Sequence, residues 1–144
     1  AWKDNRVEMY HDVVQNRAVF IVKSSGQTID AVGRALSRGI KWHRYGKSKQ
    51  PFVVKTDVSH AIVVEDAASA AAVSEYGTGI ALLGTHLTDE ALDVITGYRS
   101  VTVALDRDAT NKALHLTKRI KQFTTATMKI LREDPKVYPR GVIE

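Results

Sequence analysis

The chain has 144 residues, of which 44% are hydrophobic, and its formal net charge is +5. This length suits one domain, or one and a half small ones, and the composition excludes an intrinsically disordered chain. No apolar run approaches the roughly 20 residues of a membrane-spanning helix, and no signal-peptide pattern opens the sequence. Cysteine is absent, which excludes disulfides and thiolate zinc sites and agrees with a reducing cytoplasm.

The first half of the chain predicts a helix followed by a hairpin. Residues 1–17 carry Val7, Tyr10 and Val14 at helical spacing, which favours a polar helical lead-in. The segment 18–35, "AVFIVKSSGQTIDAVGRA", predicts two strands around a turn at residues 24–27. Gly33 inside the second strand indicates a bulge or a close backbone approach.

The positive charge is concentrated in residues 31–56, which contain no acidic residue. The basic residues there are Arg34, Arg38, Lys41, Arg44, Lys47, Lys49 and Lys55. We expect residues 37–51 to form a basic loop. Two interpretations stay open: a solvated basic face, or a surface for a polyanion, because cations around Trp42 and Tyr45 suit phosphates and stacked bases.

From Ser59 onward, short apolar segments alternate with helical segments. The apolar segments are 60–66, 79–85, 100–106 and 125–131, and the helical segments are 67–76, 87–97 and 110–123. Thr88 is the expected N-cap of the second helix. This alternation predicts an α/β fold, a parallel sheet of about four strands with helices on both faces. The cations of "TKRIKQ", residues 117–122, are interpreted as a solvated face of the third helix.

Acidic residues follow three of the four predicted strands. Glu65 and Asp66 follow the first, Asp106 and Asp108 the third, and Asp134 stands near the end of the fourth. Ligands of parallel α/β sheets bind at the carboxyl ends of the strands, so we expect these acids to converge. Two residues apart on a strand end, Asp106 and Asp108 would point the same way and share a metal edge. Oxygen ligands of this kind select Mg²⁺ or Mn²⁺ and suit phosphoryl transfer, although an Asp-x-Asp alone also fits a structural pair.

Three motifs in this order resemble the Toprim domain of primases, topoisomerases and related nucleases. They are "AIVVEDAASA", "GIALLGTHLT" and "VALDRDATNKA", with a Glu after the first strand and an Asp-x-Asp after the third. The resemblance covers roughly residues 59–136. The preceding "AVFIVKSSGQTIDAVGRAL" and "IKWHRY" look like the small basic subdomain of bacterial and phage primases. The resemblance therefore implies a basic α+β subdomain with a β-hairpin at residues 1–58 and a Toprim metal-binding domain at residues 59–144.

The resemblance also implies roles for single residues. Glu65 resembles the catalytic acid, which acts as general base or as a metal ligand. Asp106 and Asp108 resemble the metal-binding pair of the catalytic site, and Asp134 a further metal-side acid. The residues expected to contact template or nucleotide are Arg34, Lys41, Trp42, Arg44, Lys47, Lys49 and Lys112. For Lys112, an exposed helix lysine is an equally good interpretation.

These roles together imply the catalytic core of a DNA primase in the bacterial cytoplasm, encoded by a bacterium or a phage. It would join ribonucleoside triphosphates into short RNA primers on single-stranded DNA, with Mg²⁺ or Mn²⁺ as cofactor. Asp66, Ser69 and Lys136 depart from the primase pattern, where Gly, Asp and Asp are usual. Two alternatives therefore stay open: a Toprim nuclease that uses the same metals, and a non-catalytic nucleic-acid-binding module with a decayed site.

The sequence begins with Ala1 rather than Met and lacks the Cys-rich zinc module with which such primases recognise template. We therefore expect an excised core, or one that takes template recognition from a partner. A zinc-binding module and a replicative helicase would lie outside this chain.

Overall fold

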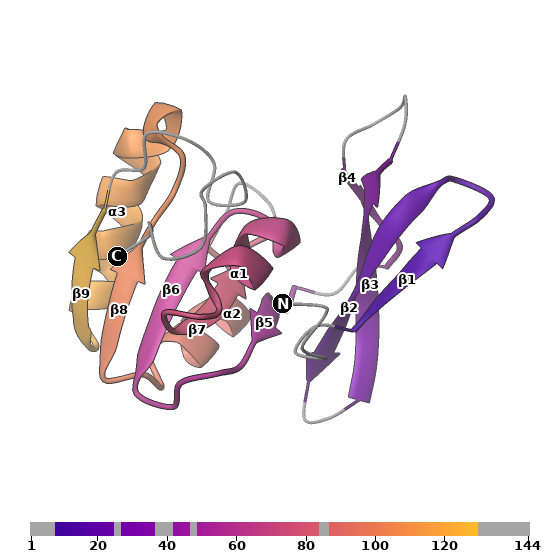
Figure 1. The fold of residues 1–144 in the computed structure, drawn as a ribbon. Coiled ribbons are helices and arrows are strands. Elements are labelled where there is room, and N and C mark those ends of the chain that lie inside the picture. The colour runs from indigo at the N-terminus through magenta and orange to yellow at the C-terminus, as the bar shows by residue number, and fades with distance from the viewer. Residues whose placement is uncertain (1–7, 25–26, 37–41, 47–48, 84–86, 130–144) are drawn as a thin grey trace.

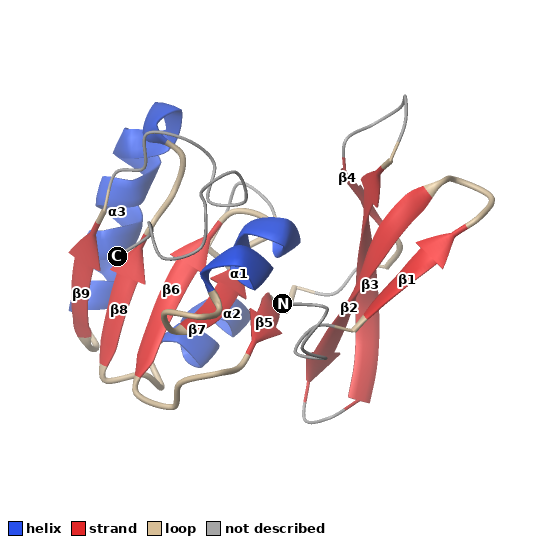
Figure 2. Cartoon of the chain, in the orientation of Figure 1, coloured by secondary structure: helices blue, strands red, loops and turns tan. Residues whose placement is uncertain are grey.

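The computed structural model describes residues 8–24, 27–36, 42–46, 49–83 and 87–129. These residues form a mixed α/β fold with an antiparallel sheet of four strands and a mixed sheet of five strands (Figures 1 and 2). Within the described residues, no helix is both long and apolar enough to cross a membrane.

The antiparallel sheet has the strand order β1-β2-β3-β4. Its strands are β1 (Met9–Asp12), β2 (Arg17–Ser24), β3 (Gln27–Ala35) and β4 (Trp42–Arg44). Strands β2 and β3 form the predicted hairpin. A bulge lies between Val22 and Lys23, whereas Gly33 pairs regularly with Val19, so a bulge at Gly33 is wrong. Side chains approach Gly33 closely instead: a Cβ there would lie 3.0 Å from Cδ of Arg17 and from the Tyr45 ring.

Two predictions for the first half are wrong. Residues 1–7 of the expected helix over residues 1–17 lie outside the described residues, and the rest is contradicted by β1, in which Met9 pairs with Phe20 and Asp12 with Arg17. Helical spacing of three apolar residues is a weak local signal, and pairing with the edge of β2 overrides it. The expected basic loop contains β4, whose Trp42 pairs with Arg34 of β3.

The five-stranded sheet has the strand order β5-β7-β6-β8-β9. Its strands are β5 (Phe52–Val54), β6 (His60–Val64), β7 (Thr78–Ala81), β8 (Ser100–Val103) and β9 (Thr125–Met128). The last four run parallel, as the alternation of strands and helices predicts. Strand β5 pairs antiparallel with β7, so this sheet takes in residues that precede Ser59.

Three helices connect the parallel strands and cover both faces of their sheet. They are α1 (Ala67–Val73), α2 (Asp89–Ile95) and α3 (Thr110–Lys121), and the 3₁₀ turn η2 (Arg107–Ala109) precedes α3. The predicted N-cap of α2 is confirmed, because the Thr88 hydroxyl accepts a hydrogen bond of 3.0 Å from the N–H of Ala91. This contact satisfies one of the N–H groups that a helix start leaves without a partner.

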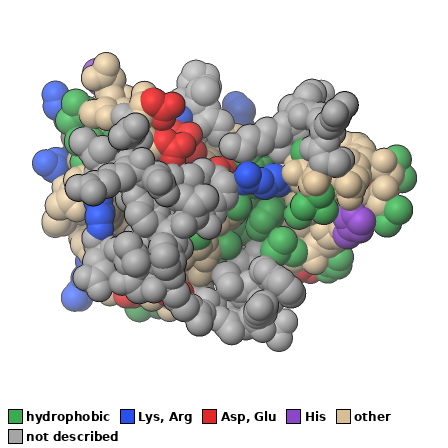
Figure 3. Space-filling model, turned by 45° about the horizontal axis from the view of Figure 1, so that its top comes forward, with side chains coloured by type: hydrophobic (Ala, Val, Ile, Leu, Met, Phe, Trp, Pro, Cys, Tyr) green, Lys and Arg blue, Asp and Glu red, His purple; other side chains and the backbone are tan. Residues whose placement is uncertain are grey.

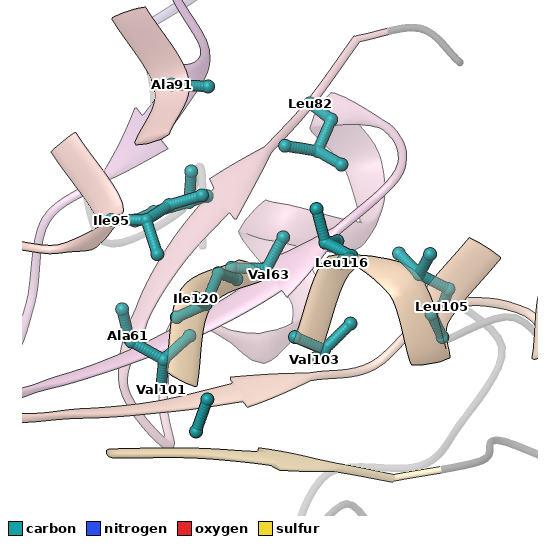
Figure 4. Packing of buried hydrophobic residues seen from close by; sticks show 13 residues of the cluster. Ala61, Val63, Leu82, Ala91, Ile95, Val101, Val103, Leu105, Leu116 and Ile120 are labelled. Carbon is teal, nitrogen blue, oxygen red and sulfur yellow. The ribbon is translucent and has the colours of Figure 1, made fainter. Parts of the chain in front are cut away.

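Side chains of the five-stranded sheet alternate between two buried clusters. In β6, Ala61 and Val63 face α2 and α3, and Figure 4 shows Val63 beside Leu116 and Ile120 of α3. Ile62 and Val64 face the other cluster, which contains α1. Burial on both faces explains why β6 has no polar alternation.

The cluster around α1 also joins the two sheets. Phe20 of β2 packs edge-on against Phe52 of β5, with ring centroids 5.6 Å apart. Helix α1 therefore covers one face of the five-stranded sheet and α2 with α3 the other, while the antiparallel sheet packs beside β5 (Figure 1).

Candidate functional site

The order of the parallel strands places a topological switch point at the carboxyl edge of the sheet. From β6 the chain passes through α1 to β7, then returns through α2 on the opposite face to β8, which lies on the other side of β6. The strand order therefore reverses between β6 and β8. In open α/β sheets, ligands bind at the carboxyl ends of the strands at such a switch point. Glu65 follows β6 here, and Asp106 follows β8 after Ala104 and Leu105.

Glu65 is half-buried directly after β6. Its backbone carbonyl accepts a hydrogen bond of 3.0 Å from the N–H of Leu83, which ties it to the end of β7. Burial raises the pKa of the Glu65 carboxyl, the positive charge of Lys112 opposes that rise, and the charges of Asp106 and Asp108 add to it. The charges of Asp106 and Asp108 thus act on Glu65, and a shared metal site of the three acids stays a prediction.

The secondary structure around Asp106 and Asp108 differs from the sequence prediction. Strand β8 ends at Val103, and Asp106 stands before the 3₁₀ turn that contains Asp108. Their placement on a strand end is therefore wrong. The 3₁₀ turn is closed by a hydrogen bond of 2.8 Å from the N–H of Ala109 to the carbonyl of Asp106. Asp106 is half-buried and Asp108 is exposed.

Lys112 lies in the first turn of α3 with a half-buried side chain. Its charge lowers the pKa of Glu65, so its ammonium group contributes to the potential at the switch point. Figure 3, in which the top of Figure 1 comes forward, shows acidic side chains gathered on this edge. The side chain of Lys112 is therefore partly accessible, and both of its interpretations stay open.

The neighbouring Asp66 caps helix α1. Its carboxylate accepts a hydrogen bond of 2.8 Å from the N–H of Ser69 and forms the N-cap of α1. Ser69 itself is buried. Asp66 and Ser69, which both depart from the primase pattern, thus both lie at the start of α1.

The acids at the switch point suit Mg²⁺ or Mn²⁺ by their donor chemistry, since both ions prefer carboxylate oxygens. Among the described residues, no three acidic, histidine or cysteine side chains are grouped closely enough to hold a metal ion. The fourth expected ligand, Asp134, lies outside the described residues. The donor set therefore fits a hard divalent cation, while the described acids do not form a closed cage for one.

Arg34 and Trp42 lie together on the antiparallel sheet, in its two paired strands β3 and β4. The guanidinium carbon of Arg34 is 5.8 Å from the centroid of the Trp42 ring, a cation–π distance. Nη1 of Arg34 is buried and has no hydrogen-bond partner among the described residues. Trp42 also packs against Phe20, with centroids 5.9 Å apart. These two expected contact residues are therefore brought together.

The other expected cations are less fully placed. Lys41 and Lys47 lie outside the described residues, and so does the side chain of Arg44, although its backbone belongs to β4. Lys49 is exposed, and its carbonyl accepts a hydrogen bond of 2.7 Å from the Thr88 hydroxyl. Lys49 therefore lies beside the start of α2.

One residue at the site has a backbone conformation that sequence reasoning missed. Leu83 has a φ of 61°, in the left-handed region that side chains with a Cβ adopt at a cost. Its N–H donates to the carbonyl of Glu65. The sequence carries no signal for it, because glycine or asparagine would be expected in that conformation.

Comparison of the chain with protein-family models, with curated proteins and with solved structures found no match.

Proposed function

We propose that the chain is the RNA-synthesising core of a DNA primase, which joins ribonucleoside triphosphates into short primers on single-stranded DNA. The observation that carries this proposal is the placement of Glu65 after β6 and of Asp106 and Asp108 after β8, the two strands that flank the switch point. The Toprim-like motifs around these three acids supply the reaction class. The cation–π pair of Arg34 and Trp42 on the antiparallel sheet supports a role with phosphates and bases.

In this proposal Asp106 and Asp108, with Asp134, would hold Mg²⁺ or Mn²⁺. When bound, such an ion activates the attacking oxygen and stabilises the leaving group in phosphoryl transfer. Glu65 accepts the proton of the primer 3′-hydroxyl on its carboxylate. Its raised pKa suits this role, because a general base works best when its pKa approaches the working pH. Lys112 attracts the triphosphate of the incoming nucleotide.

A second function has its own observations. Asp66 is engaged in capping α1, and no closed group of three metal ligands exists within the described chain. Both facts favour a nucleic-acid-binding module in which the Toprim-like site no longer binds metal. Such a module would bind single-stranded DNA with a strong salt dependence and no response to divalent ions.

Primer synthesis from labelled ribonucleotides on mixed single-stranded DNA templates tests the proposal. The reactions contain Mg²⁺, Mn²⁺ or a chelator. They compare the unchanged chain with the double variant Asp106→Ala/Asp108→Ala. Asp93→Ala serves as the matched control, because Asp93 is an exposed acid of α2 away from the switch point.

We expect metal-dependent oligoribonucleotides from the unchanged chain and from the Asp93 variant, and none from the double variant. Equal synthesis by the double variant would overturn the proposal. Cleavage of DNA or RNA without added nucleotides would assign the same acids to a nuclease instead. Metal-independent DNA binding without any product would favour the binding module.

A further inference from the structure

Leu83, the second residue after β7, has a backbone conformation that its side chain disfavours. Its φ of 61° lies in the left-handed region, where the Cβ of an L-residue comes close to the following carbonyl oxygen. Glycine and asparagine adopt this conformation far more readily. A strained residue of this kind persists only where the surrounding structure holds it, and such residues cluster at functional sites. The contacts of Leu83 therefore indicate what the strain serves.

The side chains of Leu82 and Leu83 are anchored on opposite faces of the five-stranded sheet. Leu82 is buried in the cluster with α2 and α3, where Figure 4 shows it. Leu83 is half-buried and packs against the other cluster, which contains α1. The chain that leaves β7 is therefore held on both faces of the sheet.

The backbone of these two leucines is bonded to the end of β6. The N–H of Leu82 donates a hydrogen bond of 3.0 Å to the carbonyl of Val64, and the N–H of Leu83 donates one of 3.0 Å to the carbonyl of Glu65. Consecutive N–H groups of an extended strand point to opposite neighbours. Two consecutive bonds to the same neighbour therefore require the chain to leave the extended conformation at this point.

The main chain of Glu65 is thereby fixed on every side. Val64 before it is fully buried in β6, and Asp66 after it caps α1. The carbonyl of Glu65 itself is held by the N–H of Leu83. A general base must lie within hydrogen-bond reach of the proton that it takes, and small displacements of a catalytic group cost much of the rate. A fixed main chain at Glu65 therefore has a direct use in catalysis.

We propose that Leu83 is a positioning residue for Glu65. Its left-handed backbone, held in place by the anchored side chain, keeps the Glu65 carbonyl bonded and so fixes the direction in which the carboxyl group leaves the main chain. The inference rests on the proposed function in that it takes Glu65 to be the general base. The competing role for Leu83 is to fill space in the cluster around α1.

Three substitutions separate the positioning role from packing. Leu83→Met keeps an apolar side chain of similar volume. Leu83→Ala removes the anchor but keeps the Cβ, so the backbone should relax out of the left-handed region. Leu83→Gly removes more of the side chain, yet glycine adopts the left-handed conformation without steric cost. The matched control is Met9→Ala, which shortens a half-buried side chain of β1 that packs against the same cluster.

Amide hydrogen exchange of the metal-free chain measures the bond between position 83 and Glu65. After correction for intrinsic exchange rates, we expect the amide at position 83 to exchange about tenfold faster in Leu83→Ala than in the unchanged chain. The glycine, methionine and Met9 variants should keep the original rate. The amide of Leu82, which is bonded to Val64, is the internal reference and should stay protected in every variant.

Primer synthesis, at a temperature where every variant is folded, measures the catalytic consequence. We expect kcat to fall about tenfold in Leu83→Ala with an unchanged KM for ribonucleotides, and to stay near its original value in the glycine, methionine and Met9 variants. Packing alone predicts that glycine is at least as damaging as alanine.

That order of the two variants, or equal exchange rates and kcat values in both, would overturn the inference. A chain that makes no primers would refute the proposed function, and the exchange rates would still decide whether Leu83 holds Glu65.

Discussion

The carboxylate of Asp66 accepts a hydrogen bond of 2.8 Å from the backbone N–H of Ser69. The acid beside Glu65 is therefore the N-cap of α1, a helix of only seven residues. Of the two adjacent acids at the switch point, Asp66 therefore has a structural role and Glu65 is the candidate catalytic residue. Substitutions at the two positions should accordingly have different consequences.

Replacement of Asp66 by alanine should lower the free energy of unfolding by about 1 kcal/mol, because the N–H of Ser69 loses its acceptor. Asp66→Asn should cost less, since asparagine caps helices comparably well. Urea denaturation of both variants measures the difference. Equal stability of the alanine and asparagine variants would show that the cap contributes nothing.

Gly79 of β7 should not tolerate a larger residue. A Cβ at this position would overlap the carbonyl oxygen of Ala70, so α1 would have to move away from the sheet. We expect Gly79→Ala to destabilise the chain by about 3 kcal/mol. Gly97→Ala is the control, because its Cβ would meet the nearest atom at 3.4 Å, an ordinary contact. Similar thermal midpoints for the two variants would contradict the close approach of α1 to β7.

The raised pKa of Glu65 predicts that this residue costs stability at neutral pH. Its carboxyl binds a proton more tightly in the folded chain than in the unfolded chain, so stability falls as the pH rises from the unfolded pKa through the raised folded pKa. Glu65→Gln should therefore raise the thermal midpoint at pH 8 and leave it unchanged below about pH 4. Thermal denaturation across this range measures the effect. A variant that is less stable at pH 8 would refute the assigned shift.

Tyr45 reaches across the antiparallel sheet, and its hydroxyl donates a hydrogen bond of 2.6 Å to the Asp12 carboxylate. This bond, together with the N–H of Gln15, lowers the pKa of Asp12. The stability contributed by a lowered carboxyl pKa is present at neutral pH and is lost as the pH falls through the folded pKa. Tyr45→Phe should thus lower the thermal midpoint at pH 7 and have a smaller effect at acid pH. In an Asp12→Asn background, the same change should show no such pH dependence; a persisting dependence would point to another group.

The second half of the fold could be predicted from the sequence because its signals agree with one another. Buried strands such as β6 read as continuous apolar runs, and Thr88 marks the start of α2 at a position typical of helix caps. In the first half the signals conflict. Strand β1 has four residues and pairs along one side with β2, while β4 has three residues within a basic segment. Neither is long enough to show strand alternation.

The location of the candidate site in the fold could be predicted from the sequence, but the backbone structure that carries its residues could not. Parallel strands bring Glu65 and Asp106 to one edge whatever the details of the loops. The sequence does not reveal that β8 ends before Asp106 or that a 3₁₀ turn carries Asp108. Nor does it indicate that burial would raise the pKa of Glu65, since burial depends on tertiary packing.

We propose that Asp106 and Asp108 hold a divalent cation beside Glu65. Calorimetric titration of the metal-free chain with Mn²⁺ tests it most directly, with Asp106→Ala/Asp108→Ala and Asp93→Ala measured alongside. The account predicts one saturable binding event in the unchanged chain and in the Asp93 variant, and its loss in the double variant. Undiminished Mn²⁺ binding by the double variant, or no binding by the unchanged chain, would contradict it.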